Sequence, residues 1–206
     1  MLEMARLGAG VMQPRAVEVA AQYGIPIHVR ASSKDEPGTI IRGEEALEKE
    51  VVVTGVTHDT NVAKFVVVDV PDKPGVAAKI FSSLADDGIN VDMIVQTNKR
   101  TGRTDMLFTV SKDDMASTKE IVERVCEELG GERVIVNTEV AKVSIVGAGM
   151  VSNPGVAARM FQALANEKIN IQVISTSEIK VSCLIDGSLV VPAVQAVHKE
   201  FELHVG

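Results

Sequence analysis

The stretch that decides the fold occurs twice, as PGVAAKIFSSLADDGINVDMIVQ at residues 74–96 and as PGVAARMFQALANEKINIQVIST at residues 154–176. At a constant offset of 80 residues the copies are identical at 11 of 23 positions, and most differences are mild, such as Lys79 against Arg159. A repeat of this length indicates two similar small modules on one chain. A ligand-binding feature found in one copy should therefore be sought in the other.

Around the first copy, the hydrophobic pattern predicts a strand, a helix, two strands, a second helix and a last strand. Pro74 is expected at the helix start, where its missing N–H costs nothing, and Gly88 is expected to end this helix. The βαββαβ order is that of the ferredoxin-like sandwich, an α+β fold with two helices on one face of a four-stranded antiparallel sheet. The expected strands are 63–70, 89–97, 104–110 and 133–140, and the second helix is 113–129.

The second copy repeats the order but lacks a clear last strand. After the helix expected at 189–201, only ELHVG remains, while the β-rich stretch VVVTGVTH at 51–58 has no place in the first module. We expect 51–58 to complete the second sheet, so that the first module is inserted within the second. The alternative is that ELHVG forms a short edge strand and 51–58 pairs elsewhere. The other expected elements are strands at 142–147, 169–176 and 179–185 and a helix at 154–166.

The first 50 residues form a separate leading segment. A helix is expected at 11–23, a strand at 25–31, a short strand at 39–43 and an exposed, charged linker at 44–50. The predicted organisation is a leading segment of residues 1–50, a first module of residues 62–140, and a second module made of 51–61 plus 141–206.

Composition excludes several kinds of partner. The net charge is −7, with one Tyr and no Trp, which argues against a nucleic-acid or anionic-membrane partner. No apolar run approaches the ~18 residues needed to span a bilayer, and the start MLEMARLGAG lacks a signal-peptide core. We therefore expect a soluble cytoplasmic protein. Cys126 and Cys183 are expected to be buried free thiols rather than a disulfide or a metal site.

Catalytic motifs are missing from the sequence. It contains no G-x-x-x-x-G-K-[ST] phosphate loop and no H-E-x-x-H, and its four histidines are scattered. The stretch GAGMVSNPG at 147–155 has Ser152 where a dinucleotide motif needs its third glycine. A small acyl-phosphate hydrolase on the same fold would need a catalytic Arg/Asn pair in a phosphate loop, and none is convincing. We predict no catalytic residues and no metal ligands.

Two turns offer binding sites instead. Each copy places a loop between its first strand and first helix, at 70–77 and 150–157, and a helix N-terminus can hold a carboxylate through its free amides. Gly75 and Gly155 let the backbone approach a ligand. One carboxylate plus one ammonium describes an amino acid. The alternative is that Pro-Gly simply starts a helix that Asp72 caps. The side chains that could take an ammonium or a hydroxyl are Asp72, Asn90, Asn153 and Asn170.

The repeat resembles the ACT domain, a small amino-acid-sensing βαββαβ module, and the whole chain resembles the C-terminal part of aspartate kinases. Residues 1–32, MLEMARLGAGVMQPRAVEVAAQYGIPIHVRAS, are similar to the end of their catalytic domain. Residues 65–96, with the DKPG motif, resemble their first ACT repeat, and residues 143–185, with ISTSEI, resemble their second. The upstream segments of that family that bind aspartate and phosphate have no counterpart in this sequence.

The resemblance implies feedback control of the ATP-dependent phosphorylation of aspartate, at the entry to lysine, threonine and methionine synthesis. It implies a homodimer through ACT domains and a partner in the catalytic α subunit, which would hold ATP and Mg, with no cofactor in this chain. Met1 followed by LEMA matches a regulatory β subunit, or equally a cloned fragment. The rival reading is a free-standing ACT sensor that partners another enzyme. Threonine is the first expected effector, and lysine, alone or with threonine, is the second.

The resemblance also implies effector contacts. We expect the amides of Gly75 to Ala77 to hold the carboxylate, Asp72 to take the ammonium, and Asn90, Gln96 and Asn170 to read the side chain. Asp92 could meet the ε-ammonium of lysine. Ser152-Asn153 replaces Asp72-Lys73 in the second loop, so the two loops need not bind the same ligand. The full set carried over is Asp72, Lys73, Pro74, Gly75, Val76, Ala77, Asn90, Val91, Asp92, Gln96, Val156, Ala157, Asn170, Ile171 and Ser177.

Overall fold

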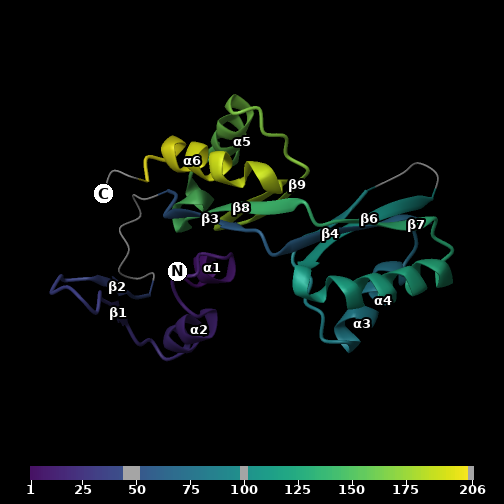
Figure 1. Cartoon of the computed structure of the whole chain (residues 1–206), viewed down its shortest axis with the longest axis horizontal. Coiled ribbons are helices and arrows are strands. Elements are labelled where there is room, and N and C mark those ends of the chain that lie inside the picture. Colours follow the sequence, from purple (N-terminus) through teal and green to yellow (C-terminus); the bar gives the residue numbers. More distant parts are fainter. Residues whose placement is uncertain (44–51, 98–101, 204–206) are drawn as a thin grey trace. The chain divides into compact units, whose positions relative to one another are not determined.

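The structure is a computed structural model that describes residues 1–43, 52–97 and 102–203, coloured along the chain in Figure 1. It divides into two compact units. The first-repeat unit consists of Thr60–Ala141 with Asp186–Ser188. The second-repeat unit consists of Met1–Asp59, Lys142–Ile185 and Leu189–Gly206.

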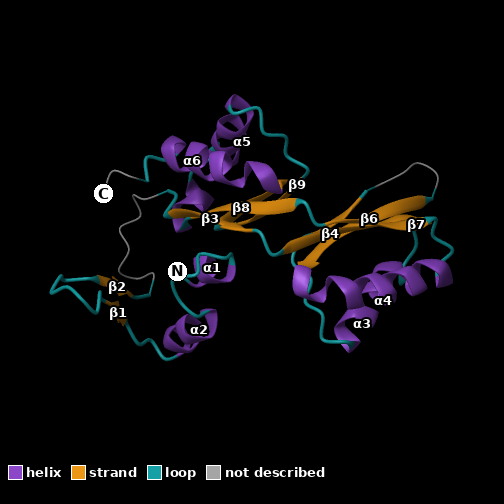
Figure 2. Cartoon of the chain, viewed as in Figure 1, coloured by secondary structure: helices purple, strands orange, loops and turns teal. Residues whose placement is uncertain are grey.

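The first-repeat unit is a four-stranded antiparallel sheet of order β5-β6-β4-β7, with both helices on one face (Figure 2). Its core lies between sheet and helices, where Phe65 stacks on Phe108 with ring centroids 5.5 Å apart and Phe81 meets Phe108 edge-on. The expected βαββαβ fold is confirmed. Its elements are β4 (Val62–Pro71), α3 (Val76–Asp86), β5 (Ile94–Gln96), β6 (Arg103–Ser111), η2 (Lys112–Asp114), α4 (Met115–Glu128) and β7 (Arg133–Asn137).

The second-repeat unit has a sheet of order β3-β8-β10-β9. Strand β3 pairs antiparallel with β8, so that Gly55 lies opposite Val146 and Asp59 opposite Lys142. This pairing confirms that the stretch upstream of the first module completes the second sheet. The elements are β3 (Gly55–Asp59), β8 (Val140–Val146), η3 (Ala148–Ser152), α5 (Val156–Asn166), β9 (Val173–Ser177), β10 (Lys180–Asp186), η4 (Gly187–Leu189) and α6 (Val190–Glu200).

The C-terminal stretch ELHVG was the alternative source of a fourth strand. Its first two residues, Glu202 and Leu203, lie in a turn after α6, and the remaining three lie outside the described residues. The edge strand of this sheet next to β8 is β3.

Several element boundaries differ from the prediction. Helix α2 begins at Pro14 instead of residue 11, and strand β9 begins at Val173 instead of residue 169. Two further differences lie close to the first-repeat loop. Helix α3 begins at Val76 after the cap residue Gly75, so Pro74 precedes the cap instead of starting the helix. Strand β5 is shorter than the expected 89–97, because the chain before it bonds irregularly to one residue of β6. The Asp92 N–H donates to the Thr109 carbonyl at 3.0 Å, and the Met93 N–H donates to the Thr109 hydroxyl at 3.1 Å.

The leading segment forms small elements within the second-repeat unit. Besides the expected helix and strand pair, it contains a five-residue helix that we did not predict, and the Thr57 hydroxyl of β3 donates to the Leu7 carbonyl after it at 3.0 Å. The expected linker at 44–50 lies outside the described residues. The elements are α1 (Leu2–Arg6), α2 (Pro14–Gln22), β1 (Ile27–Val29) and β2 (Thr39–Ile41), the last two paired antiparallel.

Both cysteines are buried free thiols, as expected. Cys183 is fully buried in β10, and this burial raises the pKa of its thiol to about 12. Within the described ranges, no cluster of three or more His, Cys, Asp or Glu side chains could hold a metal ion. In the same part of the chain, every helix is too short or too polar to cross a membrane.

Candidate functional site

The loop between β4 and α3 ends on a helix start that its own side chains do not cap. Gly75 is the cap residue, with a left-handed backbone at φ 95°, and no side chain accepts a hydrogen bond from the first turn. The Val76 N–H reaches the Lys73 carbonyl only at 3.4 Å, beyond the usual N–H···O range. The alternative that Asp72 caps the helix is therefore wrong. The first amides of α3 remain donors for an external anion.

Asp72 is held by a different partner. The Gln96 side-chain amide of β5 donates to an Asp72 carboxylate oxygen at 3.1 Å, and both side chains are exposed. The Asp72 N–H donates to the Gly102 carbonyl at 2.9 Å, which fixes the start of the loop against the start of β6. Two predicted site residues from separate elements are thus brought together beside the start of α3. The carboxylate keeps a second oxygen with which it can accept a hydrogen bond from a ligand.

Open space lies in front of both helix starts. A Cβ atom added to Gly75 would have no heavy atom within 4 Å, and the same holds for Gly155, whose φ is 97°. A left-handed backbone at φ near 95° is strained for residues with a side chain, so glycine suits both positions. The arrangement leaves room for a small ligand to approach the backbone.

The remaining first-repeat residues of the predicted set divide by exposure. Lys73, Pro74, Asn90 and Asp92 are exposed. Val91 and Ala77 are half-buried, and Val76 is buried in the core of the unit. Val76 can therefore meet a ligand only through its backbone.

The second loop is built differently. It passes through the 3₁₀ helix η3, and the Asn153 side-chain amide donates to the Gly149 carbonyl at 2.8 Å within the same loop. The positions of Asp72 and Gln96 are taken by Ser152 and Thr176, so this loop has no carboxylate in the equivalent place. The helix start at Gly155 again has no side-chain cap. Of the other predicted residues, Asn170 and Ser177 are exposed, Ala157 and Ile171 are half-buried, and Val156 is buried.

Packing explains one glycine of the GAG stretch. A Cβ atom on Gly147 would lie 2.1 Å from the Val52 carbonyl oxygen and 2.7 Å from the Val53 Cα. Main-chain atoms of a neighbouring segment therefore exclude any side chain at this position. The glycine is accounted for by close backbone contact without any dinucleotide.

Sequence reasoning missed an ion pair next to the first loop. The Arg103 Nε atom lies 2.5 Å from an Asp69 carboxylate oxygen, and the two side chains are about one third exposed. A second guanidinium nitrogen of Arg103 donates to the Gly130 carbonyl at 2.6 Å. The signal that could have found it is the acidic residue in the otherwise apolar strand FVVVDV.

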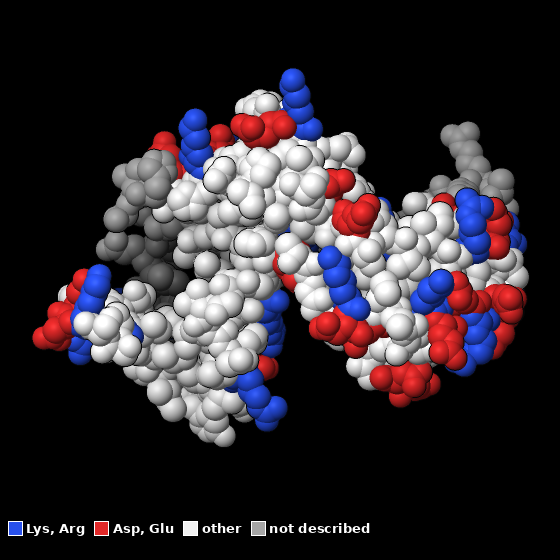
Figure 3. Space-filling model, viewed as in Figure 1, with Lys and Arg blue, Asp and Glu red and all other residues white. Residues whose placement is uncertain are grey.

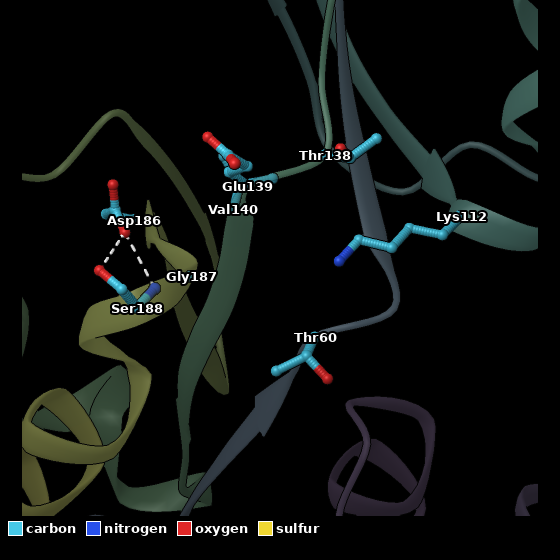
Figure 4. Close-up of a pocket in the computed structure, with 8 residues that line it drawn as sticks. All are labelled: Thr60, Lys112, Thr138, Glu139, Val140, Asp186, Gly187 and Ser188. Carbon is cyan, nitrogen blue, oxygen red and sulfur yellow. Dashed lines mark hydrogen bonds between the residues drawn. The ribbon is translucent and has the colours of Figure 1, made fainter.

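A pocket of about 470 Å³ is lined only by residues of Thr60–Ala141 and Asp186–Ser188, the two segments that make up the first-repeat unit (Figure 4). The Ser188 N–H and hydroxyl both donate to Asp186, at 2.9 and 2.5 Å, and these bonds hold the Asp186 pKa below its usual value. The pocket contains none of the predicted effector residues. It is lined by Thr60, Lys112, Thr138, Glu139, Val140, Asp186, Gly187 and Ser188.

Surface charge gives no sign of a polyanion site on the face in Figure 3, where basic and acidic side chains are interspersed. Several of the basic groups are paired with acids. Lys79 lies 2.5 Å from Glu128, which lowers the Glu128 pKa, and Arg159 at the equivalent position of the second repeat lies 2.8 Å from Glu200. The ion pair between the two helices is therefore a shared feature of both repeats.

Comparison with known proteins begins with two matches to models of the ACT domain, at residues 64–127 and 143–201. The chain is 47% identical over 204 residues to the aspartate kinase of Pseudomonas fluorescens (strain SBW25), a match that covers 98% of this chain and 49% of the relative. The chain spans about half the length of the curated relatives it matches.

Two solved structures extend the comparison. The ligand-free regulatory subunit of aspartate kinase from Thermus thermophilus has a TM-score of 0.70 and 45% identity, covering 73% of this chain and 99% of that one. A structure of aspartokinase alpha and beta subunits has a TM-score of 0.69 and 48% identity, with the same coverage. The repeat, the fold and these likenesses agree, and the chain belongs to the aspartokinase family, as its regulatory region with two ACT domains.

Proposed function

We propose that this chain senses an end-product amino acid for an aspartokinase, and that binding inhibits the phosphorylation of L-aspartate by ATP. The first-repeat loop, residues 71–77, is the proposed binding site. One observation carries the proposal: α3 begins at a left-handed glycine without a side-chain cap, and beside it stands a carboxylate that Gln96 holds in place. These two features are complementary to the two charged ends of an amino acid.

The amides at the start of α3 are the proposed contact for the carboxylate of the effector. A helix N-terminus carries unpaired N–H groups and a partial positive charge, so it binds an anion without a cationic side chain. Helix α3 runs from Val76 to Asp86, long enough for its dipole to develop, and Gly75 leaves the approach open. Because the side chain of Val76 packs in the core, the backbone alone makes this contact.

Asp72 is the proposed contact for the ammonium group. The carboxylate is exposed in the chain alone, so an ion pair there would contribute about 1 kcal/mol or less. If a second subunit covers the site, removing Asp72 would cost roughly 2–5 kcal/mol, because the ammonium would be buried without a counter-charge. Tight binding of the amino acid would therefore require that a second subunit covers Asp72.

Threonine is the proposed effector, with lysine as the second candidate, alone or together with threonine. The polar side chains around the loop are short or neutral, namely Asn90 and Gln96, and they suit a small hydroxyl group. Asp92, which is exposed on the approach to β5, is the proposed contact for the ε-ammonium of lysine. Asn170 of the second repeat is the proposed reader of the side chain from the facing ACT domain.

The proposed partner that covers the site is a second copy of the chain. Strands β5 and β9 each lie at an edge of their sheet, and they expose Ile94 and Ile174, which occupy equivalent repeat positions and are 51% and 44% exposed. A sheet edge that carries an exposed apolar side chain favours pairing with another chain. A homodimer through the ACT domains would bury both isoleucines.

The catalytic partner is the proposed source of the chemistry. A structure of aspartokinase alpha and beta subunits resembles this chain, and by analogy a longer α subunit would bind ATP, Mg and aspartate. We expect no phosphate transfer by this chain alone. Co-purification with a longer aspartokinase chain supports this role, whereas stable association with a different enzyme would support a free-standing ACT sensor instead.

Calorimetric titration with threonine and lysine, separately and combined, tests the proposed site. We expect the wild-type chain to bind at least one of them and Asp72→Asn to bind it far more weakly, because the ammonium loses its counter-charge. Asp86→Asn is the matched control, since Asp86 is an exposed carboxylate in the last turn of α3 and should not alter affinity. Equal affinity of Asp72→Asn and the wild type would contradict the site.

A further inference from the structure

The strand that leads into the first-repeat loop is interrupted just before the loop. The pairing of β4 with β6 shifts between Val67 and Val70, which marks a β-bulge. Within it, Asp69 has a left-handed backbone with φ 57°, a conformation that residues other than glycine adopt rarely. Such a conformation persists only where neighbouring groups hold it.

Arg103 contacts Asp69 at both its side chain and its main chain. Its Nε atom lies 2.5 Å from the Asp69 carboxylate, and one of its terminal nitrogens also donates to the Asp69 carbonyl. The same nitrogen donates to the Gly130 carbonyl in the turn after α4, at 2.6 Å. From the other side, Asp105 accepts a hydrogen bond from the Asp69 N–H at 2.9 Å. One guanidinium therefore ties the bulge to a turn far away in sequence.

These contacts fix the direction in which the chain enters the loop. Arg103 lies opposite Pro71 in the ladder, and the Asp72 N–H donates to the carbonyl of the preceding residue, Gly102. The segment 69–72 is thereby held at its first residue by Arg103 and at its last residue by the Gly102 carbonyl. Gln96 lies on a separate strand, β5, so its hydrogen bond to Asp72 requires that the main chain at residues 69–72 keeps a fixed position relative to that strand.

The second repeat has a different local structure at the position equivalent to Asp69. The position equivalent to Asp69 is Gly149, which lies in the 3₁₀ helix η3 after β8 has ended at Val146. The contact between Arg103 and Asp69 is therefore found in the first repeat, whose loop carries the Asp72 carboxylate. The second-repeat loop, which has Ser152 at that position, has no equivalent of Asp69.

We propose that Arg103 is a positioning residue for effector binding, which pre-shapes the loop at 71–77 by holding the Asp69 bulge. This inference rests on the proposed function of that loop. A ligand that binds one loop conformation loses apparent affinity in proportion to the population of that conformation. If loss of Arg103 lowers that population to about one tenth, the apparent dissociation constant rises about tenfold.

The test compares Arg103→Gln and Arg103→Lys with the control Arg124→Gln, which removes an exposed arginine of α4 in the same unit. Calorimetry with threonine and with lysine should show about tenfold weaker binding for Arg103→Gln. Arg103→Lys should lose less, because it keeps the charge beside Asp69 but cannot reach two partners with a planar fork. The control should bind like the wild type. Wild-type affinity of Arg103→Gln would overturn the proposal.

Amide hydrogen exchange separates this inference from the proposed function. In Arg103→Gln the amides of Asp69 and Asp72, which donate to Asp105 and to the Gly102 carbonyl, should exchange faster, while those of β6 and α4 away from the bulge stay protected. Unchanged exchange at these two amides would overturn the positioning role, even if the wild type bound no amino acid and the proposed function itself had failed. Asp69→Asn should act through the same contact, so the double variant with Arg103→Gln should lose no more affinity than either single variant.

Discussion

Gly88 and Lys168 occupy the same position in the two repeats, and both have a left-handed backbone, with φ 72° and 58°. Each follows the last turn of its helix in the same hydrogen-bond pattern: the Ile89 N–H donates to Leu84 and the Ile169 N–H to Leu164, both at 3.0 Å. This is the Schellman arrangement, in which glycine is preferred because a Cβ atom is strained there. The second repeat therefore carries strain where the first has none.

Relieving this strain should stabilise the second-repeat unit. We expect Lys168→Gly to raise the free energy of unfolding by about 0.5–1 kcal/mol, the left-handed penalty less the extra chain entropy of glycine. Gly88→Lys should lower it by a similar amount. Urea denaturation of both variants measures the change, and Glu167→Gly at the preceding, right-handed position should destabilise. A lower urea midpoint for Lys168→Gly than for the wild type would show that the left-handed backbone at Lys168 is not strained.

Gly147 should tolerate no side chain, because its would-be Cβ atom meets main-chain atoms of Val52 and Val53. We expect Gly147→Ala to lower the free energy of unfolding by about 1–3 kcal/mol, as other overpacking substitutions do. Thermal and urea unfolding report the loss. Gly43→Ala is the control: an added Cβ meets nothing within 4 Å there, so it should change stability by less than about 0.5 kcal/mol. Equal stability of the two variants would disprove the packing argument.

Two buried hydroxyl groups join the central strands of the second sheet. Ser144 of β8 and Ser182 of β10 are 1% and 2% exposed, and their oxygens lie 2.7 Å apart. Removing either hydroxyl leaves the other buried without this partner, so each single alanine variant should cost about 1–3 kcal/mol. The double variant should cost clearly less than the sum. A double-mutant cycle from urea unfolding measures this, and strict additivity would show that the contact contributes nothing.

The Cys183 thiol should make stability fall at alkaline pH. Its pKa is raised to about 12 by burial, above its ordinary value of 9.0, so the folded state keeps the proton more tightly. The contribution is complete below pH 9 and is lost as the pH rises from 9 toward 12. The free energy of unfolding should therefore fall more steeply with pH in the wild type than in Cys183→Ala. Parallel curves over this range would contradict the assignment.

Much of the fold could be predicted because both repeats follow local rules. The stripe of Val76, Ile80 and Leu84 is buried as its spacing predicts, and Gly88 ends the helix. The place of β3 could be predicted by counting strands. The second module lacked a fourth strand, and the first module was already complete without the stretch at 51–58. The exact start of α3 could not be predicted, because the left-handed cap at Gly75 depends on backbone angles that Pro74 alone does not set.

The candidate site could be predicted only as a set of residue types, not as an arrangement of side chains. The sequence pointed to Asp72 and Gln96 separately, but their contact depends on β5 lying beside the loop and on the conformations of two exposed side chains. The hold of Arg103 on Asp69 depends on a bulge, which shifts the register and cannot be deduced from hydrophobic alternation. That site residues of the first repeat, such as Asp72, and of the second repeat, such as Asn170, meet between two copies of the chain stays a prediction.

The central claim is that the amides at the start of α3 bind the amino acid. The most direct measurement is a titration of ¹⁵N-labelled chain with threonine and with lysine, followed through the amide resonances of both helix starts. We predict that the largest shifts occur at Gly75, Val76 and Ala77, with smaller or no shifts at Gly155. Saturable binding that moves neither set, or no response to either amino acid, would contradict the account.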